Sequence, residues 1–342
     1  MMQLGDSMTK RLTNACLMAV LLFADPIWAQ VPTQAMQIVD VRYQSGKITL
    51  AALLMVPRSE RPLPAAVIIQ GSGSSDRTNQ WAREIAEQLI RNGVAVLLTD
   101  KRGSGASCGD WRVAGFSDLA ADALAGVAFL RTRSEIDRQR VGLVGLSQGG
   151  SVAPLAAARS DDVAFVINIS GATVGFAEQT FVEMANTARQ AGLSEPLVEE
   201  VIRLNAAAAK YVTTGDWQQY ERARTRALQT GARAIAAGFP ATADEPIWTF
   251  LRSVATYDPL PYWVHVAQPV FVVYGEEDER DNVPVAESVR RLEHVFRSVN
   301  KANQRVLVVA GAGHAIRDPQ THRLAARFVD ALAAWLQEHV SR

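Results

Sequence analysis

The 342-residue chain contains little cysteine, has no net charge and lacks an apolar run long enough to span a membrane. Its two cysteines, Cys16 and Cys108, form no C-x-x-C pair, which excludes a disulfide scaffold and zinc sites built on cysteine pairs. The 35 Lys and Arg residues balance the 35 Asp and Glu residues, so the basic surface of a nucleic-acid-binding protein is absent. An apolar content of 48% is enough for a full core, which excludes a wholly disordered chain. What is left is a neutral globular protein.

The N-terminal segment has the pattern of a secretory signal peptide. Lys10 and Arg11 precede a short apolar run, and the small residue Ala29 marks the expected cleavage point. The run is shorter than the roughly 20 residues of a transmembrane helix. We therefore expect residues 1–29 to be removed from a secreted or periplasmic protein that has no stable membrane span. An internal disulfide is then impossible, because Cys108 becomes the single thiol. An uncleaved anchor or a buried N-terminal helix is the alternative.

Apolar runs and helical patterns alternate along the rest of the chain, which predicts an α/β fold with a mostly parallel sheet and an antiparallel hairpin at its start. The later runs are continuously apolar, as in strands that are buried on both faces. The eight predicted strands cover residues 36–42, 47–56, 65–70, 94–99, 140–144, 163–169, 269–274 and 305–310. Helices are predicted at 80–92, 118–131, 148–159, 285–299 and 321–340.

Residues 175–257 interrupt this alternation. Four helical stretches fall in the segment and no strand does; they cover 181–190, 196–211, 217–229 and 245–257. An insertion of this length between two core strands is typical of a lid or cap. We expect an α/β core in two parts, 30–174 and 258–342, with a helical cap between them. A helical packing layer without a role at the site is the alternative.

The pattern G-x-S-x-G, which is typical of a serine nucleophile on a sharp turn, occurs twice. Ser147 lies in the match at 145–149, directly after the predicted strand 140–144 and at the start of the predicted helix 148–159. This order places its hydroxyl at the carboxyl end of a strand, with a helix N-terminus directed at it. Ser107, in the second match, lies in a loop on which no helix opens. Because no glycine-rich nucleotide motif follows a strand, the sequence favours Ser147 as a nucleophile.

An activated serine needs a general base and a carboxylate that orients the base. His314 follows the last predicted strand on a glycine-flanked loop, at the same sheet edge as Ser147, and is the expected base. The preceding strand leads into an acidic loop, where Asp278 is the first choice for the acid and Asp281 is the alternative. The remaining histidines are predicted to lie on helices or before a strand; they are His265, His294, His322 and His339.

These segments together resemble the α/β-hydrolase superfamily, in particular its branch of capped serine esterases and serine-aminopeptidase-like enzymes. The resemblance covers about residues 36–340 and implies the chain order nucleophile, acid, base. It rests on Gly-Leu-Ser-Gln-Gly-Gly at 145–150, Gln-Gly-Ser-Gly at 70–73, Asp-Lys-Arg-Gly-Ser-Gly-Ala-Ser at 100–107, Tyr-Asp-Pro at 257–259, the acidic loop 275–284 and Gly-His at 313–314.

An oxyanion hole is also implied by the resemblance. One donor is the backbone N–H of Gln148, and the other comes from the loop 70–73, where Ser72 is the first choice and Gly73 the alternative. The family often has His where this chain has Gln70, which leaves open what anchors the loop. The segment 100–107 is expected to be structural.

The expected activity is hydrolysis of a small, neutral or apolar carboxylic ester through an acyl-enzyme, with no cofactor and no metal. A peptidase of the aminopeptidase type, an acyltransferase and a non-catalytic ligand-binding protein are the alternatives. A peptidase would need a carboxylate for the substrate amine, and the predicted cap offers Glu178, Glu183 and Glu245. The cap aromatics either line an apolar substrate pocket or fill the core of the cap; they are Trp217, Trp248, Phe250 and Tyr257.

Overall fold

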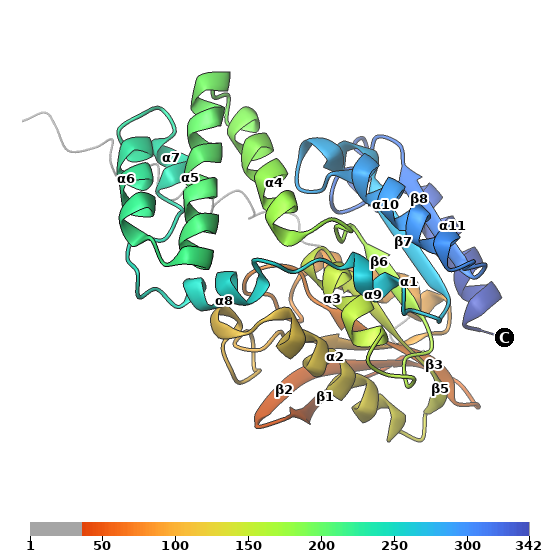
Figure 1. Cartoon of the computed structure of the whole chain (residues 1–342). Coiled ribbons are helices and arrows are strands. Elements are labelled where there is room, and N and C mark those ends of the chain that lie inside the picture. The colour runs from red at the N-terminus through yellow and green to blue at the C-terminus, as the bar shows by residue number, and fades with distance from the viewer. Residues whose placement is uncertain (1–35, 342) are drawn as a thin grey trace, which may run out of the picture. The chain divides into compact units, whose positions relative to one another are not determined.

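Eight strands form one sheet in the computed structural model, which describes residues 36–341 (Figure 1). The order across the sheet is β1-β2-β4-β3-β5-β6-β7-β8; β2 runs antiparallel to β4, and each neighbouring pair from β4 to β8 is parallel. The strands are β1 (Met36–Ser45), β2 (Ile48–Pro57), β3 (Leu63–Ile69), β4 (Ala95–Thr99), β5 (Ile136–Leu146), β6 (Val166–Ile169), β7 (Val270–Gly275) and β8 (Gln304–Val309). The expected mostly parallel α/β sheet is confirmed. The predicted signal peptide and Cys16 lie outside the described residues.

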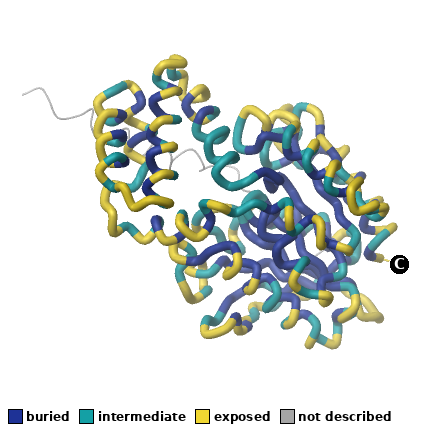
Figure 2. The backbone as a smooth tube through the Cα atoms, viewed as in Figure 1, coloured by how far each residue is buried: buried dark blue, intermediate teal, exposed yellow. Residues whose placement is uncertain are grey.

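Helices pack on both faces of the sheet. One apolar cluster joins alternate strand residues such as Val67, Leu97 and Val272 to several helices, which include α2 (Phe116–Arg131), α3 (Gln148–Ala157), α9 (Leu260–Trp263) and α10 (Val285–Ser298). Phe271, the neighbour of Val272, points to the opposite face, where its ring stacks at 5.8 Å on Trp335 of α11 (Ala326–His339). The strands between these layers are the most deeply buried part of the backbone (Figure 2).

The segment between β6 and α9 is helical, as expected. It contains α4 (Phe176–Gln190), α5 (Glu195–Thr214), α6 (Trp217–Leu228), α7 (Arg233–Ala236) and α8 (Ile247–Val254). Its two ends meet, because the N–H of Phe176 donates to the carbonyl of Tyr257 at 2.8 Å. Two apolar clusters of its own stabilise the segment, one around Trp248 and Tyr220 and the other around Ala188 and Val201.

The predicted helix at 321–340 begins too early. Residues 321–325 form a turn instead, in which the carboxylate of Asp318 accepts from the N–H groups of Gln320 and Thr321 and the backbone of His322 is left-handed at φ 56°. His322 is therefore in a loop and not on a helix. Short polar side chains that bind nearby backbone N–H groups favour such turns over a helix.

The remaining α-helix outside the insertion, within the described residues, is α1 (Gln80–Arg91). None of the described helices is long and apolar enough to cross a membrane.

Candidate active site

Ser147 occupies the sharp turn between β5 and α3. Its backbone has φ 52° and ψ −119°, a conformation that is costly for a residue with a side chain. Backbone hydrogen bonds hold the turn, since its N–H donates to Ile169 at 2.8 Å and its carbonyl accepts from Gly150 at 2.8 Å. The hydroxyl therefore stands at the carboxyl end of β5, in front of the first turn of α3.

The glycines on either side of Ser147 are required by close backbone contacts. A Cβ on Gly145 would lie 2.2 Å from the carbonyl oxygen of Gly149, and a Cβ on Gly149 would lie 2.1 Å from that of Ile69. Both distances are far below van der Waals contact, so only glycine fits at either position. This packing explains why the motif has glycine two residues before and two after the serine.

A chain of hydrogen bonds links Ser147, His314 and Asp278. Nε2 of His314 lies 2.9 Å from the Ser147 hydroxyl oxygen, and its Nδ1 lies 2.8 Å from Oδ2 of Asp278. A carboxylate only accepts hydrogen bonds, so Nδ1 carries the proton and Nε2 can accept the hydroxyl proton of the serine. The Asp278 side chain is fully buried, whereas that of His314 is 20% exposed and can reach a substrate.

The loops that carry the acid and the base are bonded to each other. Asp278 lies in η4 (Glu276–Arg280), where the N–H of Glu277 donates to the carbonyl of Ala312 at 2.9 Å. The hydroxyl of Ser170, at the end of β6, donates to the carbonyl of His314 at 2.7 Å. Asp281 makes no hydrogen bond to His314 in the described structure; its N–H donates to the carbonyl of Asp278.

The two predicted oxyanion donors lie next to Ser147. Gln148 is the first residue of α3, and the loop 70–73 packs so closely that a Cβ on Gly71 would stand 3.4 Å from the Cβ of Ser147. Within the described residues, no acceptor takes the backbone N–H of Gln148 or of Ser72. Gly73, the alternative donor, has φ 69°, a conformation in which glycine is favoured. The arrangement offers two free N–H groups beside the serine.

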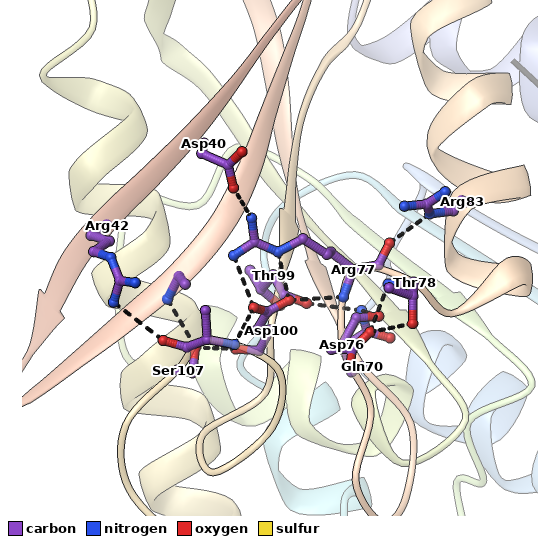
Figure 3. A network of polar contacts seen from close by, with 12 residues as sticks. Asp40, Arg42, Gln70, Asp76, Arg77, Thr78, Arg83, Thr99, Asp100 and Ser107 are labelled. Atoms are coloured by element: carbon purple, nitrogen blue, oxygen red, sulfur yellow. Dashed lines mark hydrogen bonds and ion pairs between the residues drawn. The ribbon is translucent and has the colours of Figure 1, made fainter.

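Gln70 anchors the oxyanion loop through its side chain. Nε2 donates to the carbonyls of Thr99 at 2.9 Å and Asp76 at 3.2 Å, while Oε1 accepts from the hydroxyl of Ser75 at 3.0 Å. The glutamine therefore makes the anchoring contacts that the sequence left undefined. Figure 3 shows this residue within a larger polar network.

The centre of that network is the buried carboxylate of Asp100. It accepts from Nε and Nη2 of Arg77 at 2.9 and 2.8 Å and from the N–H of Ala106 at 2.9 Å (Figure 3). Burial alone would raise the pKa of Asp100, but the hydrogen bonds from Arg77 and Ala106 lower it below its usual value. The hydroxyl of Ser107 donates to the carbonyl of Asp100 at 2.8 Å, so the second G-x-S-x-G serine holds a loop in place.

The four aromatic residues that were candidates for a substrate pocket have different positions. Trp248 lies on the wall of a mostly apolar cavity of about 570 Å³ within the insertion. Trp217 packs beside it, with ring centres 6.2 Å apart. Phe250 and Tyr257 join the main core and contact the ring of Phe116. Of the four aromatic residues, only Trp248 borders this cavity. Its other walls include Phe176, Met184, Val212, Phe239 and Leu251.

Two further residues at the site were missed in the sequence. The ring of Trp81, on α1, packs 5.5 Å from that of His314. Lys101 is buried and places Nζ 2.8 Å from the carbonyl oxygen of Gly71 and 2.6 Å from Oε1 of Gln148. The position of Lys101 at the carboxyl end of an apolar strand was a sequence pattern from which a role at the site could have been predicted. Nothing local in the sequence relates Trp81 to His314.

Within residues 36–341, no group of three or more His, Cys, Asp or Glu residues is placed to hold a metal ion. Cys108, the free thiol, is exposed on the loop after β4 and takes no part in the hydrogen-bonded chain.

Several known proteins are similar to this chain. An esterase of Pyrococcus furiosus has a TM-score of 0.58 at 17% identity, with 90% of this chain and 92% of that chain covered. Est1E of Butyrivibrio proteoclasticus, solved with ferulic acid, has a TM-score of 0.57 at 19% identity, with 88% and 99% covered. The proline iminopeptidase of Mycobacterium smegmatis has a TM-score of 0.56 at 15% identity, with 88% and 98% covered. These likenesses show the fold.

Two matches rest on the sequence itself. The quorum-quenching protein AidA of Acinetobacter baumannii is 30% identical over 156 residues, 45% of this chain, and the match spans about half (51%) of that protein's length. Residues 45–315, which include every residue of the hydrogen-bonded chain, match the family described as X-Pro dipeptidyl-peptidase (S15 family). With the α/β-hydrolase fold and this match over more than half its length, the chain belongs to the X-Pro dipeptidyl-peptidase (S15) family.

Proposed function

We propose that this chain hydrolyses carboxylic esters through an acyl-enzyme on Ser147. The hydroxyl oxygen attacks the ester carbonyl carbon while Nε2 of His314 takes the hydroxyl proton, and this proton passes to the departing alkoxide. Asp278 holds the imidazole in the required tautomer. Water then attacks the acyl-enzyme, His314 accepts its proton, and the acid and free serine are released. The observation that carries the proposal is the hydrogen-bonded chain of 2.9 and 2.8 Å beside two free N–H groups.

The N–H groups of Gln148 and Ser72 would stabilise the negative oxygen of the tetrahedral intermediate. Donors of this kind act mainly in the transition state, and the loss of one costs about 10²–10³ in turnover. Because the net charge is zero, long-range attraction of a charged substrate contributes little, which supports a neutral substrate. The apolar cavity is lined by residues of the insertion, and Ser147 and His314 do not border it. We propose that the helical insertion, residues 175–257, acts as a cap over this site.

The test compares p-nitrophenyl acetate and butyrate with aminoacyl p-nitroanilides on the purified chain. We expect turnover of the esters and labelling of the protein by a fluorophosphonate, and both should be lost in Ser147→Ala. Preferential turnover of the anilides would contradict the ester proposal. Equal labelling of Ser147→Ala would contradict the role of the serine.

Peptide hydrolysis is a second candidate, which is favoured by the carboxylate of Glu183 as a partner for the amine of a substrate. Glu178 is paired with Arg291, and Glu245 accepts from the backbone N–H of Thr242 at 3.0 Å, so neither is free for a substrate amine. Glu183 has no hydrogen bond or ion pair in the described structure. Burial raises its pKa, the charge of His314 opposes this rise, and the nearby Asp281 and Asp278 add to it. The carboxyl group of Glu183 is therefore close enough to His314 and Asp278 for their charges to act on it.

Glu183→Gln separates the two activities. If the carboxylate binds the amine of a peptide, the substitution raises KM for aminoacyl anilides about tenfold or more and leaves the uncharged esters unaffected. If the natural substrate is an uncharged ester, both KM values change little. The ester serves as the internal control, because it would reveal a general disturbance of the site.

We also propose that residues 1–29 direct export, which the sequence pattern of that segment supports. The protein recovered from the periplasm or medium of a bacterial host should begin at Gln30, as determined by N-terminal sequencing. An intact N-terminus in the cytoplasmic fraction would contradict this.

A further inference from the structure

Lys101 is an unusual residue for its position, because it is buried in the interior, next to the loop and the helix that flank Ser147. It follows Asp100 at the carboxyl end of β4, and only 7% of the residue is exposed. Nζ donates to the carbonyl oxygen of Gly71 at 2.8 Å and to Oε1 of Gln148 at 2.6 Å, and it lies 5.7 Å from the centre of the Trp111 ring. The ammonium is therefore held by two acceptors and an aromatic face.

Keeping an ammonium at this place costs free energy. Lysine is among the residues least often fully buried, and the charged form loses its hydration. Burial lowers the pKa of Lys101 to about 7. A methionine or leucine would fill the same space without this cost, so folding alone does not account for a lysine here.

The two acceptors of Lys101 share one property: each is coupled to a predicted oxyanion donor. The carbonyl of Gly71 and the N–H of Ser72 belong to the same planar peptide group, so fixing the oxygen also fixes the direction of the N–H. Gln148 supplies the second N–H from its own backbone. Gly71 packs directly against Ser147, where a Cβ would stand 3.4 Å from that of the serine. One ammonium thus binds both the peptide group that contains the Ser72 N–H and the side chain of the residue that supplies the second N–H.

We propose that Lys101 is a positioning residue for the oxyanion hole, which it organises by binding the Gly71 carbonyl and the Gln148 side chain. A hydrogen bond to the carbonyl polarises the peptide group and strengthens its N–H as a donor, and the positive charge behind both donors favours the developing oxyanion. The inference rests on the proposed acyl transfer at Ser147 and holds for an ester or an amide substrate alike.

The test uses Lys101→Met, which keeps the length of the side chain and removes its donors. We expect kcat to fall about 10–100-fold with KM within twofold of wild type, because oxyanion donors act in the transition state. The inhibition constant of a trifluoromethyl ketone, which forms a tetrahedral adduct with an oxyanion, should rise by a similar factor. Gln148→Met, which removes one of the two contacts and keeps both backbone donors, should show a smaller loss.

Lys301→Met is the matched control. Lys301 also places its ammonium on two backbone carbonyls, those of Val266 at 2.8 Å and Gln268 at 2.6 Å, and burial lowers its pKa to about 8. It lies before β8, at the amino ends of the strands and therefore at the sheet edge opposite His314. This substitution should lower the melting temperature and leave kcat and the inhibition constant unchanged.

A chemical rescue shows whether the charge itself matters. In a Cys108→Ser background, Lys101→Cys treated with 2-bromoethylamine regains an ammonium at nearly the original distance. At least a third of the lost kcat should return, whereas treatment with iodoacetamide should restore none. Equal recovery with both reagents would overturn the proposal.

The rate of fluorophosphonate labelling keeps this inference distinct from the proposed ester activity. Phosphonylation of Ser147 uses the same oxyanion hole and needs no natural substrate. Slower labelling of Lys101→Met supports the proposal even if esters are poor substrates, and failure on esters alone concerns the substrate class. The proposal is overturned if Lys101→Met labels and turns over within twofold of wild type, or if its losses match those of Lys301→Met.

Discussion

Arg291 on α10 donates two hydrogen bonds, each 2.9 Å long, to the carboxylate of Glu178 on α4. This pair ties the first helix of the insertion to a helix of the core. Further along the same helix, Asn186 donates to the carbonyl of Glu279 at 3.1 Å and Gln190 to that of Arg280 at 2.8 Å, so α4 is bonded to the loop that carries Asp278. The position of the insertion is thus coupled to the acid of the site.

Arg291→Met should loosen the insertion without unfolding the protein. The two side chains are 28% and 42% exposed, and ion pairs with such access to water contribute about 0–1 kcal/mol. We expect faster cleavage within residues 175–257 in limited proteolysis and a melting temperature within a few degrees of wild type. A large loss of stability with an unchanged proteolysis pattern would show that the pair supports the core instead.

Asp278→Asn and Asp281→Asn should differ by orders of magnitude. The first substitution removes the carboxylate that fixes the tautomer of His314 and should lower kcat by about 10⁴. The second changes a side chain that makes no hydrogen bond to the histidine and should leave kcat within about threefold. Steady-state kinetics and fluorophosphonate labelling measure both. A reversed order would assign the acid to Asp281.

Gly275→Ala should damage the site, whereas Gly313→Ala should be tolerated. A Cβ on Gly275 would lie 2.3 Å from the carbonyl oxygens of both Ala312 and Gly313, so the acid loop and the histidine loop would be forced apart. No atom lies within 4 Å of a Cβ on Gly313. We expect a loss of at least 10-fold in kcat for the first variant and less than threefold for the second. Equal effects would show that flexibility, and not this close contact, requires the glycines.

Lys101 should also make stability depend on pH in a defined direction. Its pKa falls from 10.5 to about 7 on folding, so between these values the unfolded chain binds more protons and stability rises with pH, by at most about 1.4 kcal/mol per unit. Below about pH 7 the lysine is charged in both the folded and the unfolded state, and the cost of desolvating its charge lowers the free energy of unfolding in full. The free energy of unfolding of Lys101→Met minus that of wild type should therefore decrease from pH 7 to pH 10 in denaturant titrations. A difference that stays constant over this range would contradict the shift.

The sequence located the candidate catalytic side chains because each follows a strong local pattern. The spacing of Gly145, Ser147 and Gly149 is a short sequence pattern, so it can be recognised without the rest of the fold, although the contact that requires Gly149 is with Ile69 of β3. His314 and Asp278 each follow a continuously apolar strand, and parallel strands bring their carboxyl ends to one edge. Residues 321–325 were misassigned, because the side chain of Asp318 binds the backbone N–H groups that a helix would use.

The long-range contacts could not be read in this way. The chain alone left Asp278 and Asp281 as alternatives, since both occur in one acidic loop, and η4 decides by turning the first inward to full burial. It left the anchor of the oxyanion loop open, and the fold supplies Gln70 and its contact with Thr99, 29 residues away. Each of these outcomes depends on which groups lie within hydrogen-bond reach after folding, namely Nδ1 of His314 for Asp278 and the carbonyl of Thr99 for Gln70.

The sequence by itself determined the candidate nucleophile, the candidate base and their order along the chain, because glycine spacing and apolar runs are local properties of the chain. Only the tertiary structure decided which acid meets His314, that Glu183 rather than Glu178 or Glu245 lacks a hydrogen bond within the described residues, and that Lys101 binds next to the predicted oxyanion donors. Those relationships join residues 30 to 113 positions apart. Their energies come from burial and direct hydrogen bonds, which exist only once the sheet has brought its loops together.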